Sequence, residues 1–476
     1  MTERYDAAII GAGADGLTAA ALLARAGLRV VVLERRAEPG GRLVTREFHP
    51  GFRAAPFTDA VRPIPDDLFR RLDLARHGAW LAPAPEAIAL WPDRVATVPP
   101  GFAVEARARR AAALAHAAMP EPPPPSRWNI FAKPVADIWP QEDWSHRSLA
   151  DLAEADAALL LDAPTLDPFA PGTALRLLAA PENGTWHGAL GGLGEALLAA
   201  AREAGAEIAC NREVGDIRCE KERAATLVTA DGGEIAARAV LSTLDLKRTF
   251  LSLFPWSALP SATVRQIGAF RMQGSSARLL AALSVRPKSH LLGVLPRGPV
   301  HVMPDARALV EAYAAWRAGV LADKLPLTLR FPSAIDPSLA PPGGATMTVG
   351  IGGVPHTLFD GVWTNEKRNL LTARALDAIE QVFPGIGATI VGLELITPSD
   401  IEQQLGATAG DLDGGEIAPD QMFAFRPGLG CKSPHTPVEG LYLAGPSSAA
   451  GPLGTCVAGA IAADALLTDL RAGKLP

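Results

Sequence analysis

The sequence contains few cysteines, and none of them are arranged to suit a metal site or a redox pair. The four cysteines, Cys210, Cys219, Cys431 and Cys456, include no Cys-x-x-Cys pair. This excludes a zinc site or a dithiol centre in its usual form, and we predict no metal ligands. Isolated thiols suit a reducing compartment, and the N-terminus lacks a basic segment followed by a cleavage site. We therefore expect a cytoplasmic protein.

Several other signals are missing, and each absence removes a class of function. The nine histidines are dispersed and no Gly-x-Ser-x-Gly motif occurs, which disfavours a hydrolase. The net charge is −6 and the basic residues are scattered, so we expect no nucleic-acid partner. Aromatic residues make up 6% and hydrophobic residues 48% of the 476 positions. This composition is typical of a globular protein, and the length suggests two or three domains.

One segment without charge, residues 441–463, is just long enough to cross a bilayer. It starts with a short strand-like run, breaks at Gly445 and Pro446, and ends in an alanine-rich stretch. Because the breaks interrupt any continuous helix, we predict a buried strand, loop and helix instead of a membrane span.

The N-terminus carries the pattern of a dinucleotide-binding unit. An apolar run at 6–10 leads into Gly-x-Gly-x-x-Gly with glycines at Gly11, Gly13 and Gly16, then a helical stretch and a second apolar run ending at Glu34. In such units the glycines allow a tight turn, close approach of the backbone to a pyrophosphate, and close helix packing. Glu34 lies 23 residues after Gly11, near the spacing of an acid that binds a ribose hydroxyl.

The residues after Glu34 extend this motif. Glu34 disfavours the 2′-phosphate of NADP, although Arg35 and Arg36 leave that question open. Gly40 and Gly41 can bring the backbone against a cofactor, and an adjacent arginine, Arg42, can bind a pyrophosphate. Taken alone, the two glycines would favour an ordinary turn over a cofactor contact.

Residues 6–53 resemble the N-terminus of the FAD-dependent amine oxidase and phytoene desaturase superfamily. Two further blocks, 186–214 and 397–445, resemble the phytoene desaturase-like branch in the same order. The resemblance implies FAD as the cofactor. Together with the glycine motif, it implies cofactor contacts at Gly11, Gly13, Gly16, Glu34, Arg35, Gly41, Arg42, Val214, Gly445, Gly454, Thr455 and Cys456.

The resemblance also raises questions about five single residues. His187 is either an acid or base near the flavin or a simple hydrogen-bond partner. Arg426 either neutralises a pyrophosphate or reduced flavin or belongs to a surface turn. Val214 is compatible with plain core packing, and Cys456 with either covalent flavin attachment or a small buried residue. Asp413 stands where related chains often have histidine.

The rest of the chain predicts a substrate region and no second nucleotide domain. Local patterns predict helices over 194–205 and 365–382, a strand over 207–209 and a hairpin turn at Asp231 and Gly232. The glycine run at 188–194 follows no apolar strand, which argues against an NADPH-to-disulfide enzyme. A polyproline stretch at 120–125 and nearby aromatic residues (Trp128, Phe131, Trp139 and Trp144) suit irregular packing, an apolar tunnel or a lip that touches a membrane.

We therefore predict an α/β protein with a Rossmann-like FAD-binding domain and an inserted α+β substrate domain. The expected FAD-binding parts are 1–80, 186–250 and 401–476, with a cap insertion at 81–185 and a substrate domain at 251–400. The predicted function is an FAD-dependent oxidoreductase that oxidises or isomerises an apolar or conjugated small molecule. An amine or amino-acid oxidase, and a non-enzymatic binding protein of the GDP-dissociation-inhibitor type, remain open as alternatives.

Overall fold

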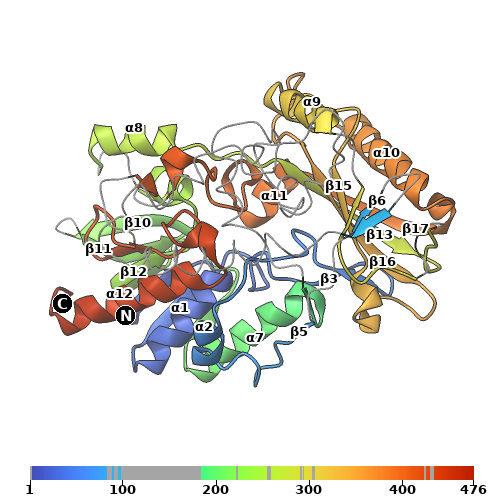
Figure 1. The fold of residues 1–476 in the computed structure, drawn as a ribbon. Coiled ribbons are helices and arrows are strands. Elements are labelled where there is room, and N and C mark those ends of the chain that lie inside the picture. Colours follow the sequence, from blue (N-terminus) through green and yellow to red (C-terminus); the bar gives the residue numbers. More distant parts are fainter. Residues whose placement is uncertain are drawn as a thin grey trace.

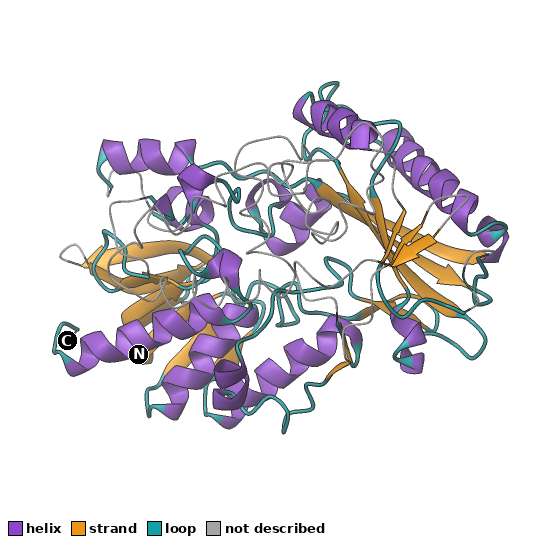
Figure 2. Cartoon of the chain, in the orientation of Figure 1, coloured by secondary structure: helices purple, strands orange, loops and turns teal. Residues whose placement is uncertain are grey.

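The computed structural model describes residues 3–82, 88–90, 95–97, 184–220, 223–254, 259–289, 292, 294–302, 306–422, 425–428 and 434–475. The polyproline stretch, the four aromatic residues near it and Cys431 lie outside these residues. Two large sheets, each with its own helices, organise the described residues (Figures 1 and 2).

The first sheet has seven strands and a parallel centre. Its main order is β10-β11-β12-β1-β2-β9, and β18 also pairs with β12. The parallel strands are β1 (Glu3–Ile10), β2 (Val30–Leu33), β9 (Glu207–Ala209), β12 (Glu234–Ser242) and β18 (Leu441–Leu443). The antiparallel strands β10 (Val214–Glu220) and β11 (Arg223–Thr229) extend one edge, and β11 reaches β12 through the predicted turn at Asp231 and Gly232. Segments from three distant parts of the chain therefore form one sheet.

Helices and strands cover the two faces of this sheet because side chains alternate along its strands. Ile9 packs with α1 (Ala14–Arg25), α7 (Ala189–Glu203) and α12 (Val457–Arg471), whereas Ile10 packs on the other side with Ile217 of β10 and Ile267 of α8 (Ser261–Ala269). Figure 1 shows α1, α7 and α12 together below the sheet and α8 above it. Both faces are buried, as is typical of a parallel sheet.

The second sheet also has seven strands and is antiparallel apart from one pair. Its order is β17-β13-β16-β15-β14-β6-β7, with β14 and β6 parallel. The strands are β6 (Ile88–Leu90), β7 (Val95–Thr97), β13 (Ser276–Leu283), β14 (Val300–Val302), β15 (Leu327–Arg330), β16 (Ala345–Gly352) and β17 (Ile390–Ile396). The helices α9 (Ala306–Arg317) and α10 (Asn365–Val382) lie along this sheet (Figure 1).

Smaller elements lie outside the two large sheets. The hairpin β3 (Arg46–His49) and β4 (Phe52–Ala54) and the pair β5 (Leu81–Ala82) and β8 (Thr185–Trp186) belong to neither large sheet. Two short helices, α2 (Asp66–Arg71) and α11 (Pro398–Leu405), complete the α-helices of the described residues.

The predicted fold class is confirmed: a Rossmann-like parallel sheet is combined with a separate antiparallel sheet. The predicted domain boundaries stay a prediction. The segment at 441–463 forms β18, a loop and the start of α12, as expected. No helix in the described ranges is long and apolar enough to cross a membrane.

One predicted boundary is wrong. A helix from residue 194 to 205 was expected after a glycine turn, but α7 starts at Ala189 and includes that glycine run. A Cβ on Gly194 would lie 2.1 Å from the Leu43 oxygen, and one on Gly191 would lie 2.7 Å from the Thr45 nitrogen. The glycines therefore let a helix pack tightly against residues 43–45 and do not form a turn.

Candidate functional site

The glycine motif forms the turn between β1 and α1. Gly11 has a φ of +97°, which a side chain rarely adopts, and a Cβ on Gly16 would lie 2.0 Å from the Gly11 oxygen. Gly13 is the N-cap of α1, and a Cβ there would meet no described atom within 4 Å. Gly16 therefore holds the helix against the strand end, while Gly13 exposes the backbone at the N-terminus of α1.

Glu34 is held at the end of β2 by the same loop. Its side chain is 7% exposed, and its Oε2 accepts a hydrogen bond from the Ala12 nitrogen at 2.9 Å. Its Oε1 accepts from the Arg36 nitrogen at 3.0 Å. These two bonds fix the carboxylate beside the glycine turn, where it can accept further hydrogen bonds from a ligand.

Gly40 and Gly41, in the loop after β2, pack against the glycine turn between β1 and α1. The Gly40 nitrogen donates to the Ala12 oxygen at 2.7 Å, and a Cβ on Gly41 would lie 3.0 Å from the Gly13 Cα. The two loops thus touch, and their contact leaves little room for a side chain at position 41.

A cleft with about 1370 Å³ of empty space, including its open mouth, runs along these elements. Nine of the predicted cofactor-binding residues line it: Gly11, Gly13, Glu34, Arg35, Gly41, Arg42, Val214, Gly454 and Thr455. They come from the turn after β1, the loop after β2, the start of β10 and the loop before α12. The cleft also lies at the carboxyl ends of parallel strands, where open α/β sheets bind their ligands.

Three predicted residues lie behind this lining. Gly16 and Gly445 allow close packing, since a Cβ on Gly445 would lie 2.3 Å from the Thr243 oxygen. Cys456 is fully buried with a φ of +70°, and burial, with a smaller effect of Asp15, raises the pKa of its thiol to about 12. A buried neutral thiol is a poor nucleophile, so this position suits packing and not covalent attachment.

His187 does not line the cleft. Its side chain is 65% exposed, and its ring lies edge-on to Trp80. Its Nε2 is 3.8 Å from an oxygen of Asp336, whose carboxylate also accepts from the Gly188 nitrogen at 2.7 Å. At 3.8 Å this is an ion-pair contact and not a hydrogen bond, and because the exposed ring lies outside the cleft, the geometry does not support an acid or base role there.

Arginines surround the Glu34 end of the cleft, and the sequence suggested only part of this group. Arg35 Nη2 donates to the Gln403 oxygen and Arg248 Nε to the Gly406 oxygen, both at 2.9 Å. Burial and the nearby Arg248 lower the pKa of Arg35. Arg36 and Arg212 also line this end. The carbonyls at the end of α11 thus hold two guanidinium groups beside Glu34.

Buried charges lie at the other end of the cleft. Arg62 pairs with Asp413, and the Arg42 Nη1 donates to the Leu412 oxygen at 3.3 Å. Burial and the charge of Asp413 raise the pKa of Asp411 to about 6. Asp413, which the resemblance marked as unusual, is therefore the partner of an arginine more than 300 residues away in the sequence.

Arg426 belongs to this buried group, so the surface-turn interpretation is wrong. It is 2% exposed, and its Nη2 donates to the oxygens of Asp413 at 2.8 Å and Pro446 at 2.9 Å. Burial lowers the pKa of its guanidinium to about 10. Arg426 does not line the cleft. It therefore holds the loop that carries Asp411 and Asp413 against the loop that follows β18.

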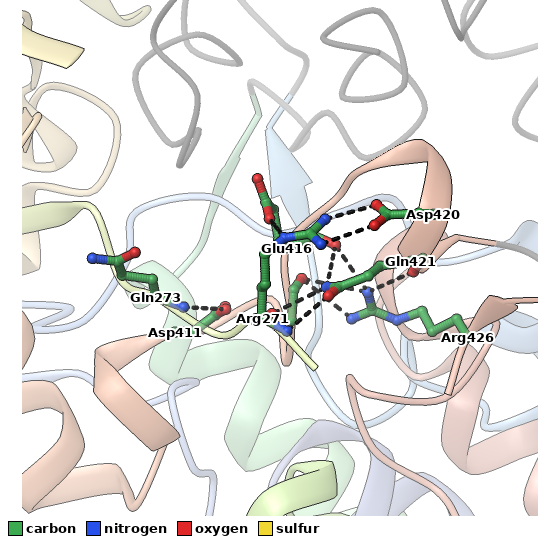
Figure 3. Close-up of polar contacts among 8 residues, drawn as sticks. Arg271, Gln273, Asp411, Glu416, Asp420, Gln421 and Arg426 are labelled. Carbon is green, nitrogen blue, oxygen red and sulfur yellow. Dashed lines mark hydrogen bonds and ion pairs between the residues drawn. The ribbon is translucent and has the colours of Figure 1, made fainter. Parts of the chain in front are cut away.

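A hydrogen-bond network continues from Arg426 to a second cavity (Figure 3). Arg271 pairs with Glu416 and, through two bonds of 2.7 and 2.8 Å, with Asp420. The Gln421 side chain accepts from the Arg271 nitrogen at 2.7 Å, and the Gln273 nitrogen donates to Asp411 at 3.1 Å. Asp411 lines the cleft, whereas Arg271 and Gln273 line the second cavity. The network thus links the walls of two cavities.

Sequence reasoning missed several residues of the cleft. Asp15 lies inside the glycine motif at a position that the motif leaves free, and Thr243 follows β12. Asp245, Arg248 and Asp411 have no local signal, because they reach the cleft only through the arrangement of the sheet and the loops around α11. In the described ranges, no group of three or more histidine, cysteine or acidic residues is placed to hold a metal ion.

The comparisons with known proteins agree with this geometry. Residues 9–63 match the model of the NAD(P)-binding Rossmann-like domain family. The chain is 27% identical to the rat (Rattus norvegicus) pyridine nucleotide-disulfide oxidoreductase domain-containing protein 2, across 99% of this chain and 94% of that protein. It is also 27% identical to the lycopene-forming phytoene desaturase of Pseudescherichia vulneris, across 64% of this chain and 61% of that enzyme.

A solved structure shares the overall fold. A double mutant of putrescine oxidase superimposes with a TM-score of 0.60 at 14% sequence identity, and the match covers 99% of this chain and 100% of that chain. Together with the glycine turn, Glu34 and the cleft, these matches show a Rossmann-like FAD- or NAD(P)-binding domain in a chain that is similar in sequence to a phytoene desaturase and shares the fold of an amine oxidase.

Proposed function

We propose that the cleft binds FAD and that the chain is an FAD-dependent oxidoreductase acting on an apolar or conjugated small molecule. The observation that carries the proposal is the single cleft formed by Gly13, Glu34, the Gly41-Arg42 pair and the Gly454-Thr455 pair, which are far apart in the sequence. A long ligand with several kinds of polar group fits such a lining better than a compact one does.

The residues of the cleft fit the parts of a dinucleotide. No side chain among the described residues caps α1, so the N–H groups of its first turn can donate to a pyrophosphate. Glu34 can accept hydrogen bonds from ribose hydroxyls, and Val214 offers an apolar surface at the same end. Arg42, which also lines the cleft, supplies a positive charge that can bind a pyrophosphate.

The protein contributes position and electrostatics, whereas bound FAD would supply hydride acceptance or donation. Glu34 and the N-terminus of α1 would bind and orient the cofactor. Gly41, packed against Gly13, keeps this part of the cleft wall free of side chains. The likeness to a phytoene desaturase supports an apolar or conjugated substrate.

The first test is the visible absorption spectrum of the purified protein before and after mild denaturation. We expect a flavin spectrum and release of free FAD. Colourless protein that also fails to take up added FAD would refute the proposal and favour a non-enzymatic binding protein. Titrations with NAD and NADP, measured in the same way, test whether the cleft prefers a nicotinamide dinucleotide instead.

A matched pair of glycine variants tests whether this cleft is the binding site. Gly13→Ala places a methyl group on the cleft side of a residue whose φ of −78° suits alanine, so the fold should persist while FAD affinity falls at least about tenfold. Gly268→Ala is the control, because its Cβ would also meet no described atom within 4 Å but lies in α8, outside the cleft. Equal FAD affinity in both variants would contradict the assignment.

The substrate class is tested by anaerobic reduction of the flavin. Mixing the protein with conjugated polyenes in detergent should bleach the flavin absorbance, and the same polyene should be recovered in oxidised form. Bleaching by amines, with peroxide released after oxygen is admitted, would instead assign an amine oxidase activity.

A further inference from the structure

Asp15 lies where the N-termini of two helices meet. It is in the first turn of α1 and lines the cleft. Its Oδ1 accepts a hydrogen bond from the nitrogen of Gly459, in the first turn of α12, at 3.1 Å. A Cβ on Gly459 would lie 2.0 Å from the main-chain oxygen of Asp15, so the two helices touch at this point. The carboxylate therefore lies at the positive ends of both helices.

The charged groups around Asp15 act in opposite directions. Arg42, from the loop after β2, and Arg62, from the loop after β4, favour its ionised form, as do the backbone N–H groups at the start of α12. Burial opposes ionisation and is the largest effect, so the pKa of Asp15 is raised to about 6. Cys456 precedes α12 and carries a neutral thiol.

A pyrophosphate bound at α1 would place fixed negative charge beside this carboxylate. The N–H groups that would hold the phosphate belong to the same helical turn as Asp15. Like charges at such short range make the ionised carboxylate less favourable. A protonated Asp15 can still accept the hydrogen bond from the Gly459 nitrogen, so protonation removes the repulsion and keeps the contact between the helices.

We propose that dinucleotide binding in this cleft is coupled to protonation of Asp15, so that cofactor affinity decreases as the pH rises. This inference rests on the proposed function, since it requires a dinucleotide at the glycine turn. Asp15 is then a positioning residue that links α1 to α12 and sets the pH range in which the cofactor is retained.

The sign of the effect follows from linkage. Below about pH 6 Asp15 is largely protonated in the free protein, and binding needs no further proton. Between this value and the higher pKa in the complex, each binding event takes up as much as one proton, and the dissociation constant rises by as much as about tenfold per pH unit. Above both values the affinity is again constant, but weaker.

Calorimetric titration of flavin-free protein with FAD tests this coupling. Titrations at several pH values between 5.5 and 8.5 (chosen to bracket the free value of about 6), each in two buffers of different ionisation enthalpy, give the number of protons taken up. We expect wild-type protein to take up close to one proton at the pH where its affinity changes most steeply. Asp15→Asn should take up none, show a flat pH profile, and bind more tightly than wild type at the alkaline end.

Asp411→Asn is the matched control, because Asp411 is the other carboxyl group of the cleft whose pKa is raised to about 6. We expect this variant to keep the proton uptake. Loss of uptake in Asp411→Asn, or its persistence in Asp15→Asn, would overturn the assignment to Asp15. Wild-type protein that binds FAD without proton uptake would overturn the coupling while leaving the proposed function intact, whereas absence of FAD binding at every pH would refute both.

Discussion

Replacing Arg426 by methionine should destabilise the protein strongly, although this residue does not line the cleft. The guanidinium group is 2% exposed and donates hydrogen bonds of 2.8 and 2.9 Å to the oxygens of Asp413 and Pro446. Methionine fills much of the same space but donates nothing. Two buried carbonyl oxygens then lose their partner, at about 1–3 kcal/mol each.

The charge of Arg426 adds a second contribution. Its positive charge lowers the pKa of Asp411, which burial and Asp413 raise to about 6. Removing one partner from a buried group of charges typically costs about 3–5 kcal/mol, a range that includes the lost hydrogen bonds. We therefore expect the free energy of unfolding to fall by about 3–5 kcal/mol at pH 8.

The loss should be smaller at pH 5. A carboxyl group whose pKa is raised in the folded state stabilises the fold at low pH, and this contribution is lost as the pH rises through the folded pKa. Without Arg426 the pKa of Asp411 rises further, so in the variant the decrease of stability with rising pH continues to higher pH. At pH 5 Asp411 is protonated with or without Arg426, and only the hydrogen-bond contribution remains.

Urea unfolding followed by tryptophan fluorescence at pH 5 and pH 8 measures both effects. Arg426→Lys keeps the charge but cannot bridge both carbonyl oxygens in the same way, so we expect an intermediate loss. The double variant with Asp411→Asn should recover part of the stability at pH 8. A loss below about 1 kcal/mol in Arg426→Met, the typical value for an exposed ion pair, or a loss independent of pH, would refute this reasoning.

Three further predictions concern packing and buried groups. Gly16→Ala should reduce both stability and flavin content, because its Cβ would lie 2.0 Å from the Gly11 oxygen; wild-type flavin content would contradict this. Burial lowers the pKa of His301 to about 3, so below about pH 6.5 only the unfolded chain takes up a proton at this residue. The free energy of unfolding of the wild type should therefore fall by about 1.4 kcal/mol per pH unit relative to that of His301→Gln. Urea midpoints of the two proteins at pH 7 and pH 5 check this, and parallel pH profiles would contradict it. Iodoacetamide at pH 8 should modify the exposed Cys219 and leave the buried Cys456 unmodified until the protein unfolds, as judged by mass spectrometry.

The sequence predicted the parts of the fold in which local pattern and tertiary structure agree. The glycine turn, β2, β9 and α10 follow directly from apolar runs, stop signals and periodicity. The helix that starts at Ala189 was misplaced because its glycines serve a contact with residues 43–45, which no local pattern reveals.

The candidate site shows the same division between local and distant information. Gly13, Glu34 and Arg42 could be predicted because their spacing is part of a local motif. The pair of Arg62 and Asp413 and the position of Arg248 beside Arg35 depend on loops that meet only in the folded chain. The exposed position of His187, beside Trp80 and outside the cleft, is likewise set by the folded chain and not by its place in a glycine-rich segment.

The buried charges near the glycine turn explain why proton uptake should fall on Asp15. Three carboxyl groups, those of Asp15, Asp411 and Asp413, face the guanidinium groups of Arg42, Arg62 and Arg426. When all six are ionised, their charges sum to zero before a ligand binds. A pyrophosphate makes this sum negative, and either Asp15 or Asp411 can restore the balance by taking up a proton, since both have a raised pKa. Asp15 shares the first turn of α1 with the N–H groups that would bind the phosphate, whereas Asp411 is held by the Gln273 and Asp413 nitrogens on a separate loop. Because repulsion decreases with distance, the added negative charge acts most strongly on Asp15.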